Sequence, residues 1–315
     1  MTRAFLFPGQ GAQAVGMGHA LAEASPEARY VFEEVDDTLG QHLSRTMWEG
    51  PEEHLTLTEN AQPALMTVSM AVVRTLEKEA GVPLRERAHY VAGHSLGEYT
   101  ALCAAGALSL ADAATLLRVR GRAMQQAVPV GEGGMAALLG LDLDTVHGVA
   151  GQAAGETGGV CRVANDNAPG QVVVSGHKAA VDRAGELAKE KGAKRVQPLA
   201  VSAPFHCDLM QPAAETMAES LASAHLDRPV PPVVSNVTAD ATDDPETIRR
   251  RLVDQVTGTV RWRESVETMA ANGVANLVEL GAGKVLSGLA RRIDRNLAAT
   301  SVETPHDIEE LLKSL

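Results

Sequence analysis

The chain has 315 residues, of which 45% are hydrophobic, and a formal net charge of -12 at pH 7. This size and apolar content allow a substantial buried core, either in one large domain with an insertion or in two domains. The acidic balance argues against nucleic acid or an anionic membrane as a partner, because binding phosphate groups requires concentrated Lys and Arg.

The cysteines and the apolar segments indicate the compartment. Cys103, Cys161 and Cys207 are odd in number and lack C-x-x-C spacing, so we expect neither a disulfide framework nor a metal site. No apolar segment approaches the ~20 residues of a membrane span, and the run at residues 4–7 is too short for a signal sequence. We therefore expect a soluble, cytoplasmic protein.

Strands and helices alternate in the first part of the chain, which is the order expected of an α/β domain. The predicted elements are strands at residues 4–7 and 90–92 and helices at 64–79, 98–108 and 109–126. The first strand ends in the Gly-rich turn Pro8-Gly9-Gln10-Gly11. Ser109 and Asp112 stand at capping-box spacing, which marks the start of the last helix.

Residues 128–198 follow a different pattern and predict a small inserted domain. Its elements run in the order β-α-β-β-α-β, typical of a ferredoxin-like domain. The predicted elements are strands at 135–141, 160–164, 171–175 and 195–201 and helices at 143–154 and 178–191. The segment 165–170 is rich in Asn, Asp, Pro and Gly, so we expect it to form a hairpin turn.

The α/β pattern resumes after the insertion. The predicted elements are helices at 209–224 and 245–256 and strands at 233–237 and 276–280. We therefore predict an α/β-hydrolase-like catalytic domain with a parallel sheet, formed by residues 1–127 and 199–315.

The motif Gly93-His94-Ser95-Leu96-Gly97 has the G-x-S-x-G pattern of a nucleophile elbow between the strand at 90–92 and the helix at 98–108. Glycines on both sides allow a sharp turn, and the amino end of the helix can stabilise a developing oxyanion. The alternative is an ordinary Gly-rich turn with an incidental serine. A reactive Ser95 needs a general base.

Histidine is the usual base for such a serine, and His206 is the best placed of ten. It follows the last strand of the small domain, where the chain re-enters the large domain near the ends of its strands. His94 is too close to Ser95 along the turn to reach its hydroxyl, and we interpret it as a packing or supporting residue. A solvated or core role remains the alternative for any single histidine.

Taken in order, several landmarks resemble the malonyl-CoA to acyl carrier protein transacylases of fatty acid synthesis and the related acyltransferase domains of polyketide synthases. The resemblance extends over the whole chain, and any one landmark alone would be weak evidence. The landmarks lie at residues 7–11, 58–64, 93–99, 118–124, 165–176, 204–207, and 255 with 260–262.

The resemblance implies a dyad. It makes Ser95 the nucleophile and His206 the base, and it assigns the orientation of the histidine to the backbone carbonyl of Gln255. No aspartate obviously completes a triad, although Asp208 and Asp227 lie downstream of the elbow. Taken by itself, Gln255 could be an exposed residue at a helix end.

The resemblance also implies how the acyl group is held. It places the malonyl carboxylate on Arg120, whose planar fork suits a carboxylate, and the oxyanion on the backbone N–H groups of Gln10 and Leu96. Without the resemblance, Arg120 could be a solvated helix charge and Gln10 part of a plain turn. Helical spacing places Arg118 and Arg122 on a different face from Arg120.

Four more residues are expected near the acyl pocket: His94, Met124, Asn165 and Phe205. Turn chemistry explains Asn165 equally well. Phe205 resembles the bulky residue of malonyl-selective domains, which favours malonyl over methylmalonyl.

The implied partners are malonyl-CoA, as a substrate, and an acyl carrier protein, with no cofactor. Carrier proteins are acidic, so docking needs a local basic patch; the candidates are Arg249 to Arg251, and Lys189, Lys191, Lys194 and Arg195. Other acyl units, a polyketide pathway, a serine hydrolase and a silent docking module remain alternatives.

Overall fold

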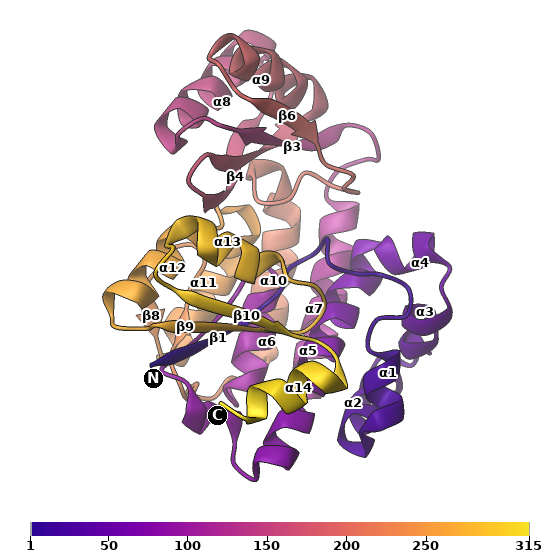
Figure 1. Ribbon diagram of the computed structural model, residues 1–315. Helices are drawn as coiled ribbons and strands as arrows, with labels where there is room; N and C mark the ends of the chain where they lie inside the picture. The colour runs from indigo at the N-terminus through magenta and orange to yellow at the C-terminus, as the bar shows by residue number, and fades with distance from the viewer. Residues whose placement is uncertain (1, 315) are drawn as a thin grey trace.

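Two β-sheets organise residues 2–314, the part of the chain that the computed structural model describes, and they lie one above the other in Figure 1. The large sheet has the strand order β10-β9-β1-β2-β7-β8, and all its strands pair in parallel except β8, which is antiparallel to β7. Its strands are β1 (Arg3–Phe7), β2 (Tyr90–Gly93), β7 (Val233–Val234), β8 (Ala241–Thr242), β9 (Asn276–Leu280) and β10 (Ala298–Val302).

Both faces of this sheet are buried. Along β1, Phe5 and Phe7 belong to one hydrophobic cluster and Ala4 and Leu6 to another, because successive side chains of a strand point to opposite faces. Strands buried on both faces are apolar throughout, which makes β1 recognisable in the sequence.

The helices cover the two faces unequally. Residues of α12 (Trp262–Ala271) and α13 (Val285–Ile293) pack in the cluster of Ala4 and Leu6, and those of the long α5 (Thr58–Ala80) in the cluster of Phe5 and Phe7. The remaining helices beside the large sheet are α1 (His19–Ala24), α2 (Pro26–Leu39), α3 (Leu43–Glu49), α4 (Glu52–Thr56), α6 (Gly97–Ala104), α7 (Leu110–Gln126), α10 (Gln211–Ser223), α11 (Pro245–Thr257) and α14 (Pro305–Leu312), with short 3₁₀ turns at Leu84–Arg87 and Asp208–Met210. No helix within residues 2–314 has both the length and the apolar character needed to cross a membrane.

The small sheet is antiparallel, with the strand order β4-β5-β3-β6. Figure 1 shows its two helices on the side away from the large sheet. Met135 and Ala137 of β3 face the main core, whereas Ala136 and Leu138 face these helices. The elements are β3 (Gly133–Leu139), α8 (Leu143–Thr157), β4 (Cys161–Ala168), β5 (Gln171–His177), α9 (Lys178–Glu190) and β6 (Arg195–Pro198).

Backbone pairing joins the two parts of the molecule. Val260, just before α12, donates to the carbonyl of Ala164 at 2.9 Å and accepts from the N–H of Asp166 at 2.9 Å, as an added parallel partner of β4. The Asp166 side chain, only 2% exposed, forms an ion pair with Arg263 at 2.8 Å. This junction fixes β4 against α12, whose residues pack on the large sheet.

Several expectations from the sequence need correction. The segment 165–170 is not a turn throughout, since β4 continues to Ala168 and the turn is Pro169-Gly170, with Gly170 at φ 70°. Asn165 therefore lies in a strand, held by the pairing with Val260. The helix expected at 98–108 ends at Ala104, and the strands expected at 195–201 and 233–237 end at Pro198 and Val234.

The sequence patterns predicted none of the elements α1 to α4, α12 to α14, β8 and β10. A signal existed for α2: Ser25 caps its N-terminus, Pro26 follows, and Ala28, Val31 and Phe32 are buried on one face. The other elements are short or lie outside the motifs. A short segment contains too few turns for its hydrophobic periodicity to be recognised in the sequence.

Candidate active site

The G-x-S-x-G segment forms a sharp corner between β2 and α6, with Ser95 in the left-handed region at φ 53°. A Cβ atom on Gly93 would lie 1.9 Å from the carbonyl oxygen of Gly97, and one on Gly97 would lie 2.3 Å from that of Phe7. Only glycine fits at either position, and the corner that the two glycines permit projects Ser95 from the carboxyl end of the sheet.

Asn236, which sequence reasoning missed, locks this corner. Its Oδ1 accepts from the Ser95 N–H at 2.7 Å, and its Nδ2 donates to the Gly93 carbonyl at 2.7 Å. The side chain is fully buried. Its position two residues past β7, the neighbour of β2, was the available signal, because the carboxyl ends of parallel strands meet at one edge.

Ser95 and His206 are in contact, and Gln255 orients the histidine. The Ser95 Oγ to His206 Nε2 distance is 2.8 Å, and His206 Nδ1 lies 2.8 Å from the Gln255 carbonyl oxygen. Since a carbonyl only accepts, Nδ1 carries the hydrogen and Nε2 is free to accept from Ser95. Burial, and then the charge of Arg120, lower the pKa of His206 to about 3. At neutral pH the imidazole is uncharged, the form a general base requires.

No aspartate serves this histidine within residues 2–314. Asp208 forms an exposed ion pair with Arg162, and Asp227 pairs with His225 on the surface.

Arg120 lies at the centre of the pocket, only 1% exposed. Its Nη1 donates to Gln62 Oε1 at 2.8 Å, and its Nη2 donates to Gln255 Oε1 at 2.9 Å and to Ser95 Oγ at 3.0 Å. Within residues 2–314 no carboxylate forms an ion pair with it. Burial lowers its pKa, so a carboxylate entering the pocket would meet a desolvated cation.

The neighbouring arginines on α7 point elsewhere, as the helical spacing predicts. Arg122 forms an ion pair with Glu59 at 2.7 Å. Arg118 is buried, with its Nη1 donating to Asn60 Oδ1 at 2.9 Å. Neither lines the pocket with Arg120.

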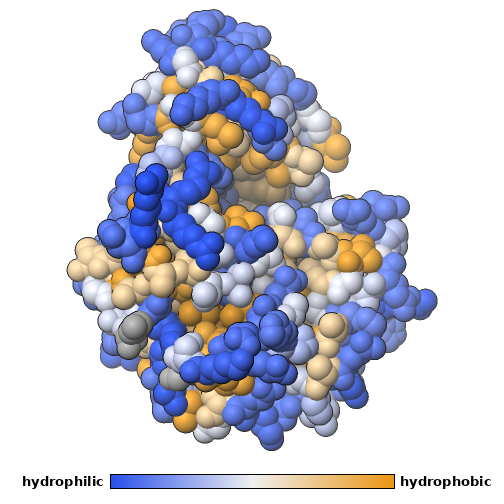
Figure 2. Space-filling model, viewed as in Figure 1, coloured by the Kyte–Doolittle hydropathy of each residue, from blue (hydrophilic) through white to orange (hydrophobic). Residues whose placement is uncertain are grey.

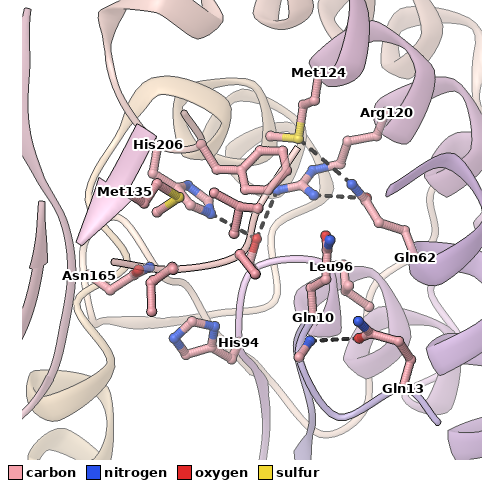
Figure 3. A pocket seen from close by; sticks show the side chains of 16 residues that line it. Gln10, Gln13, Gln62, His94, Leu96, Arg120, Met124, Met135, Asn165 and His206 are labelled. Atoms are coloured by element: carbon pink, nitrogen blue, oxygen red, sulfur yellow. Dashed lines mark hydrogen bonds between the residues drawn. The ribbon is translucent and has the colours of Figure 1, made fainter. Parts of the chain in front are cut away.

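A cavity of about 280 Å³ opens beside Ser95, at the hollow below the small sheet in Figure 2. Figure 3 shows Gln10, Leu96 and His94 on one side of it and His206 and Arg120 above. Met124, Asn165 and Phe205 line it too. Gln62, Met135 and Val201 are further lining residues, which the sequence did not indicate.

The expected oxyanion donors border this cavity. In the described chain, neither the Gln10 nor the Leu96 backbone N–H donates to another residue. The Gln10 side chain accepts from Thr58 Oγ1 at 2.8 Å, which holds the loop after β1 in place. Two N–H groups beside a serine suit a developing oxyanion.

His94 supports the corner rather than the serine hydroxyl. Its Nε2 lies 2.8 Å from Asn167 Oδ1 and its ring contacts Trp262. It therefore links the elbow to β4 of the small sheet.

A buried carboxylate, which the sequence analysis did not identify, lies beneath the pocket. Glu98, 1% exposed, accepts through Oε2 from the Asn236 N–H at 3.1 Å and from Gln255 Nε2 at 2.8 Å. Burial raises its pKa to about 7, although its hydrogen bonds and Arg120 act in the opposite direction. The feature of the sequence that could have identified Glu98 is its place in the first turn of the helix after the elbow, three residues after Ser95.

The arrangement suits the transfer of a carboxylate-bearing acyl group through an ester on Ser95. Residues 2–314 contain no group of three His, Cys, Asp or Glu side chains placed to hold a metal ion.

The chain resembles characterised proteins over its whole length. The acyl transferase domain family model matches residues 4–300. A malonyl CoA-acyl carrier protein transacylase of Bacillus subtilis is 47% identical over 312 residues, covering 99% of this chain and 96% of that protein.

Solved structures agree with the sequence matches. The acyl-carrier-protein S-malonyltransferase of Bartonella henselae aligns with a TM-score of 0.97 and 54% identity, covering 100% and 99% of the two chains. A malonyl-transacylase in complex with a type II polyketide synthase acyl-carrier protein aligns with a TM-score of 0.96 and 41% identity, covering 100% of both.

Proposed function

The chain belongs to the acyl transferase family, with close relatives among the malonyl CoA-acyl carrier protein transacylases, and we infer that it transfers a malonyl group from coenzyme A to the thiol of an acyl carrier protein. The observation that carries the assignment to a carboxylated acyl group is Arg120: a buried cation without an ion-pair partner in residues 2–314, in contact with Ser95 Oγ.

In the first half-reaction, His206 removes the hydroxyl proton of Ser95, and Ser95 Oγ attacks the thioester carbon of malonyl-CoA. The tetrahedral oxyanion is bound by the N–H groups of Gln10 and Leu96. The imidazolium then gives its proton to the departing coenzyme A thiolate, which leaves malonyl-Ser95. In the second half, His206 activates the thiol of the carrier protein, which attacks the ester and regenerates Ser95.

Arg120 orients the acyl group throughout. We place the malonyl carboxylate on its guanidinium, which turns from Ser95 Oγ to make two parallel hydrogen bonds. A group held at both its carboxylate and its carbonyl leaves little room for a hydrolytic water, which separates transfer from hydrolysis.

The dyad works without a neighbouring carboxylate on the histidine. The carbonyl oxygen of Gln255, 2.8 Å from His206 Nδ1, fixes the tautomer of the histidine. It stabilises the imidazolium less than a carboxylate would. No cofactor takes part in this scheme.

Phe205 supports malonyl over methylmalonyl as the preferred unit. It lines the cavity, is 9% exposed and precedes His206, so it can restrict substituents at the α carbon of the acyl group. Supply of fatty acid synthesis is the pathway we propose, with polyketide assembly as the second candidate because one relative serves a polyketide carrier protein.

The finer description of the fold is also part of this proposal. The large sheet with its elbow is interpreted as α/β-hydrolase-like, formed by residues 1–127 and 199–315. Residues 128–198 are interpreted as ferredoxin-like, supported by the order β4-β5-β3-β6 of their strands. A cytoplasmic location fits three cysteines that are all free and buried.

Of the candidate basic docking patches, the one on the small domain is the better supported. Lys189, Lys191 and Lys194 lie near the exposed end of α9 and after it. On α11, by contrast, Arg249 donates to the Ala224 carbonyl and Arg251 forms an ion pair with Asp240.

Intact mass spectrometry after incubation with malonyl-CoA tests the function. We expect one malonyl group on the wild-type chain, none on Ser95→Ala, and its loss when a carrier protein with a free phosphopantetheine thiol is added. Release of coenzyme A in plain buffer at the same rate as in the presence of carrier protein would instead identify a hydrolase.

A further inference from the structure

Glu98 is a buried carboxylate to which the proposed reaction assigns no task. Its Oε2 faces two donors, the Asn236 N–H and Gln255 Nε2, and its side chain is closed off from solvent. Such a group is costly to bury unless its charge is balanced.

The amide of Gln255 connects this carboxylate to Arg120. Nε2 of the amide donates to Glu98 at 2.8 Å, while Oε1 accepts from Arg120 Nη2 at 2.9 Å. The amide dipole thus has its positive end on the carboxylate and its negative end on the guanidinium. Arg120 and Glu98 are therefore opposite charges that do not touch and are linked through one amide group.

The other titratable groups around Glu98 cannot take its place. Tyr99, next to it on α6, lies under the Arg120 guanidinium, and burial raises the pKa of its hydroxyl. His206, and His94 on the elbow, both have lowered pKa values because they are buried. Glu98 is therefore the one acidic group in this part of the described chain that can balance Arg120 near neutral pH.

We propose that Glu98 is the charge-balancing partner of Arg120: it is ionised while the pocket holds no carboxylate, and it takes up one proton from solvent when the malonyl carboxylate binds Arg120. This inference rests on the proposed function, since it needs a carboxylated acyl group in the pocket. It makes Glu98 a specificity-determining residue that acts through Gln255 and does not touch the substrate.

The direction of the effect follows from the charges. Burial raises the pKa of Glu98 to about 7, and Arg120 opposes that rise. A malonyl carboxylate neutralises Arg120 and adds a second negative charge nearby, so the pKa of Glu98 rises further when malonyl binds. Above pH 7 the ionised Glu98 competes with malonyl for Arg120, and the affinity for malonyl-CoA falls as the pH increases.

Calorimetry of a Ser95→Ala variant, which cannot form the ester, measures the proton directly. Titrations at pH 7.5 in two buffers of different ionisation enthalpy give the number of protons taken up on binding. We expect the protein to take up about half a proton more when it binds malonyl-CoA than when it binds acetyl-CoA. Proton exchange at the phosphates is common to the two ligands and cancels in the difference. Equal uptake for the two ligands would overturn the proposal.

Glu98→Gln in the Ser95→Ala background assigns that proton. We expect it to abolish the difference between the ligands and to strengthen malonyl-CoA binding about tenfold at pH 8. The matched control is Glu279→Gln, another fully buried glutamate, which accepts from the N–H groups of Leu286 and Ser287 and does not line the pocket. The control variant should still take up more protons with malonyl-CoA than with acetyl-CoA. A difference that persists in Glu98→Gln would assign it to His206 and overturn the inference.

Two measurements keep the test independent of other failures. Malonylation of wild-type Ser95 is measured first, so a failed proposed function is recognised before Glu98 is tested. If Glu98→Gln does not fold, infrared difference spectra of the Ser95→Ala variant answer the question: malonyl-CoA should convert one carboxylate band to a protonated-acid band relative to acetyl-CoA. No such conversion would contradict the proposal.

Discussion

The two walls of the acyl pocket differ in kind. The wall from the large sheet is a polar network in which Ser95, Arg120 and Gln255 are joined by hydrogen bonds of 2.9 to 3.0 Å. The wall from the small sheet and the segment after it is mainly apolar, with Met135, Leu199 and Val201 facing the cavity. The difference indicates a division of labour, in which the polar wall performs the chemistry and the apolar wall limits the size of the acyl group.

The largest expected effect comes from a substitution in the polar wall. Arg120→Gln should lower the rate of malonyl-Ser95 formation about a hundredfold, because two charge-assisted hydrogen bonds to the malonyl carboxylate are lost. Acetylation of Ser95 should fall much less, since acetyl has no carboxylate. Stopped-time mass spectrometry with both acyl-CoAs measures the ratio.

Arg118→Gln is the matched control on the same helix. Arg118 is also buried, but it binds Asn60 outside the pocket. It should lower stability and leave the ratio of malonyl to acetyl unchanged. A change in ratio as large as that of Arg120→Gln would remove Arg120 from its special role.

The polar wall also predicts how stability depends on pH. His206 has its pKa lowered from 6.5 to about 3, so its buried neutral form costs stability as the pH falls below 6.5. His206→Gln should therefore gain stability relative to wild type on acidification, by about 1.4 kcal/mol per pH unit between pH 6 and pH 4. Urea unfolding at several pH values measures this.

For Glu98, stability should depend on pH in the opposite direction. Its pKa is raised from 4.5 to about 7, so its contribution to stability is fully present below pH 4.5 and is lost as the pH rises to 7. Glu98→Gln should gain stability relative to wild type over that interval. Parallel slopes for the two variants would refute the charge states assigned to the network.

The smallest effect concerns the apolar wall. Met135→Ala should change the rate of malonylation less than about fivefold. It should raise the rate for methylmalonyl-CoA relative to malonyl-CoA about three- to tenfold, because the shorter side chain leaves room for one additional methyl group. Competition between the two acyl-CoAs, read by mass, gives the ratio. Met210→Ala, a fully buried methionine outside the pocket, should lower stability without altering the ratio.

The sequence was most informative where the backbone itself imposes a residue type. Gly93 and Gly97 are required by contacts of 1.9 Å and 2.3 Å, so the five-residue motif indicated the sharp turn, while the role of its serine depended on finding a base. The inserted pattern at 128–198 was visible in the same way, because strand and helix periods are local. Arg120 needed the family resemblance, since nothing local distinguishes it from other charged residues, whereas His206 was already favoured by its position after the last strand of the insertion.

What the sequence could not provide depends on distant chain segments. Asn236, Gln255 and Glu98 belong to separate elements and meet only because β7 and α11 end, and α6 begins, at one edge of the large sheet. Their burial changes their chemistry: in water Glu98 would be an ordinary surface acid and His206 an ordinary base.

The elbow motif, the order of the elements within residues 128–198 and the family resemblance were therefore readable in the amino-acid sequence. The ionic state of the site was settled by the fold, because desolvation and the partners of a charge are set by packing and not by neighbours in the chain. The extension of β4 through Asn165 was settled in the same way, by pairing with Val260 rather than by the local preference for a turn.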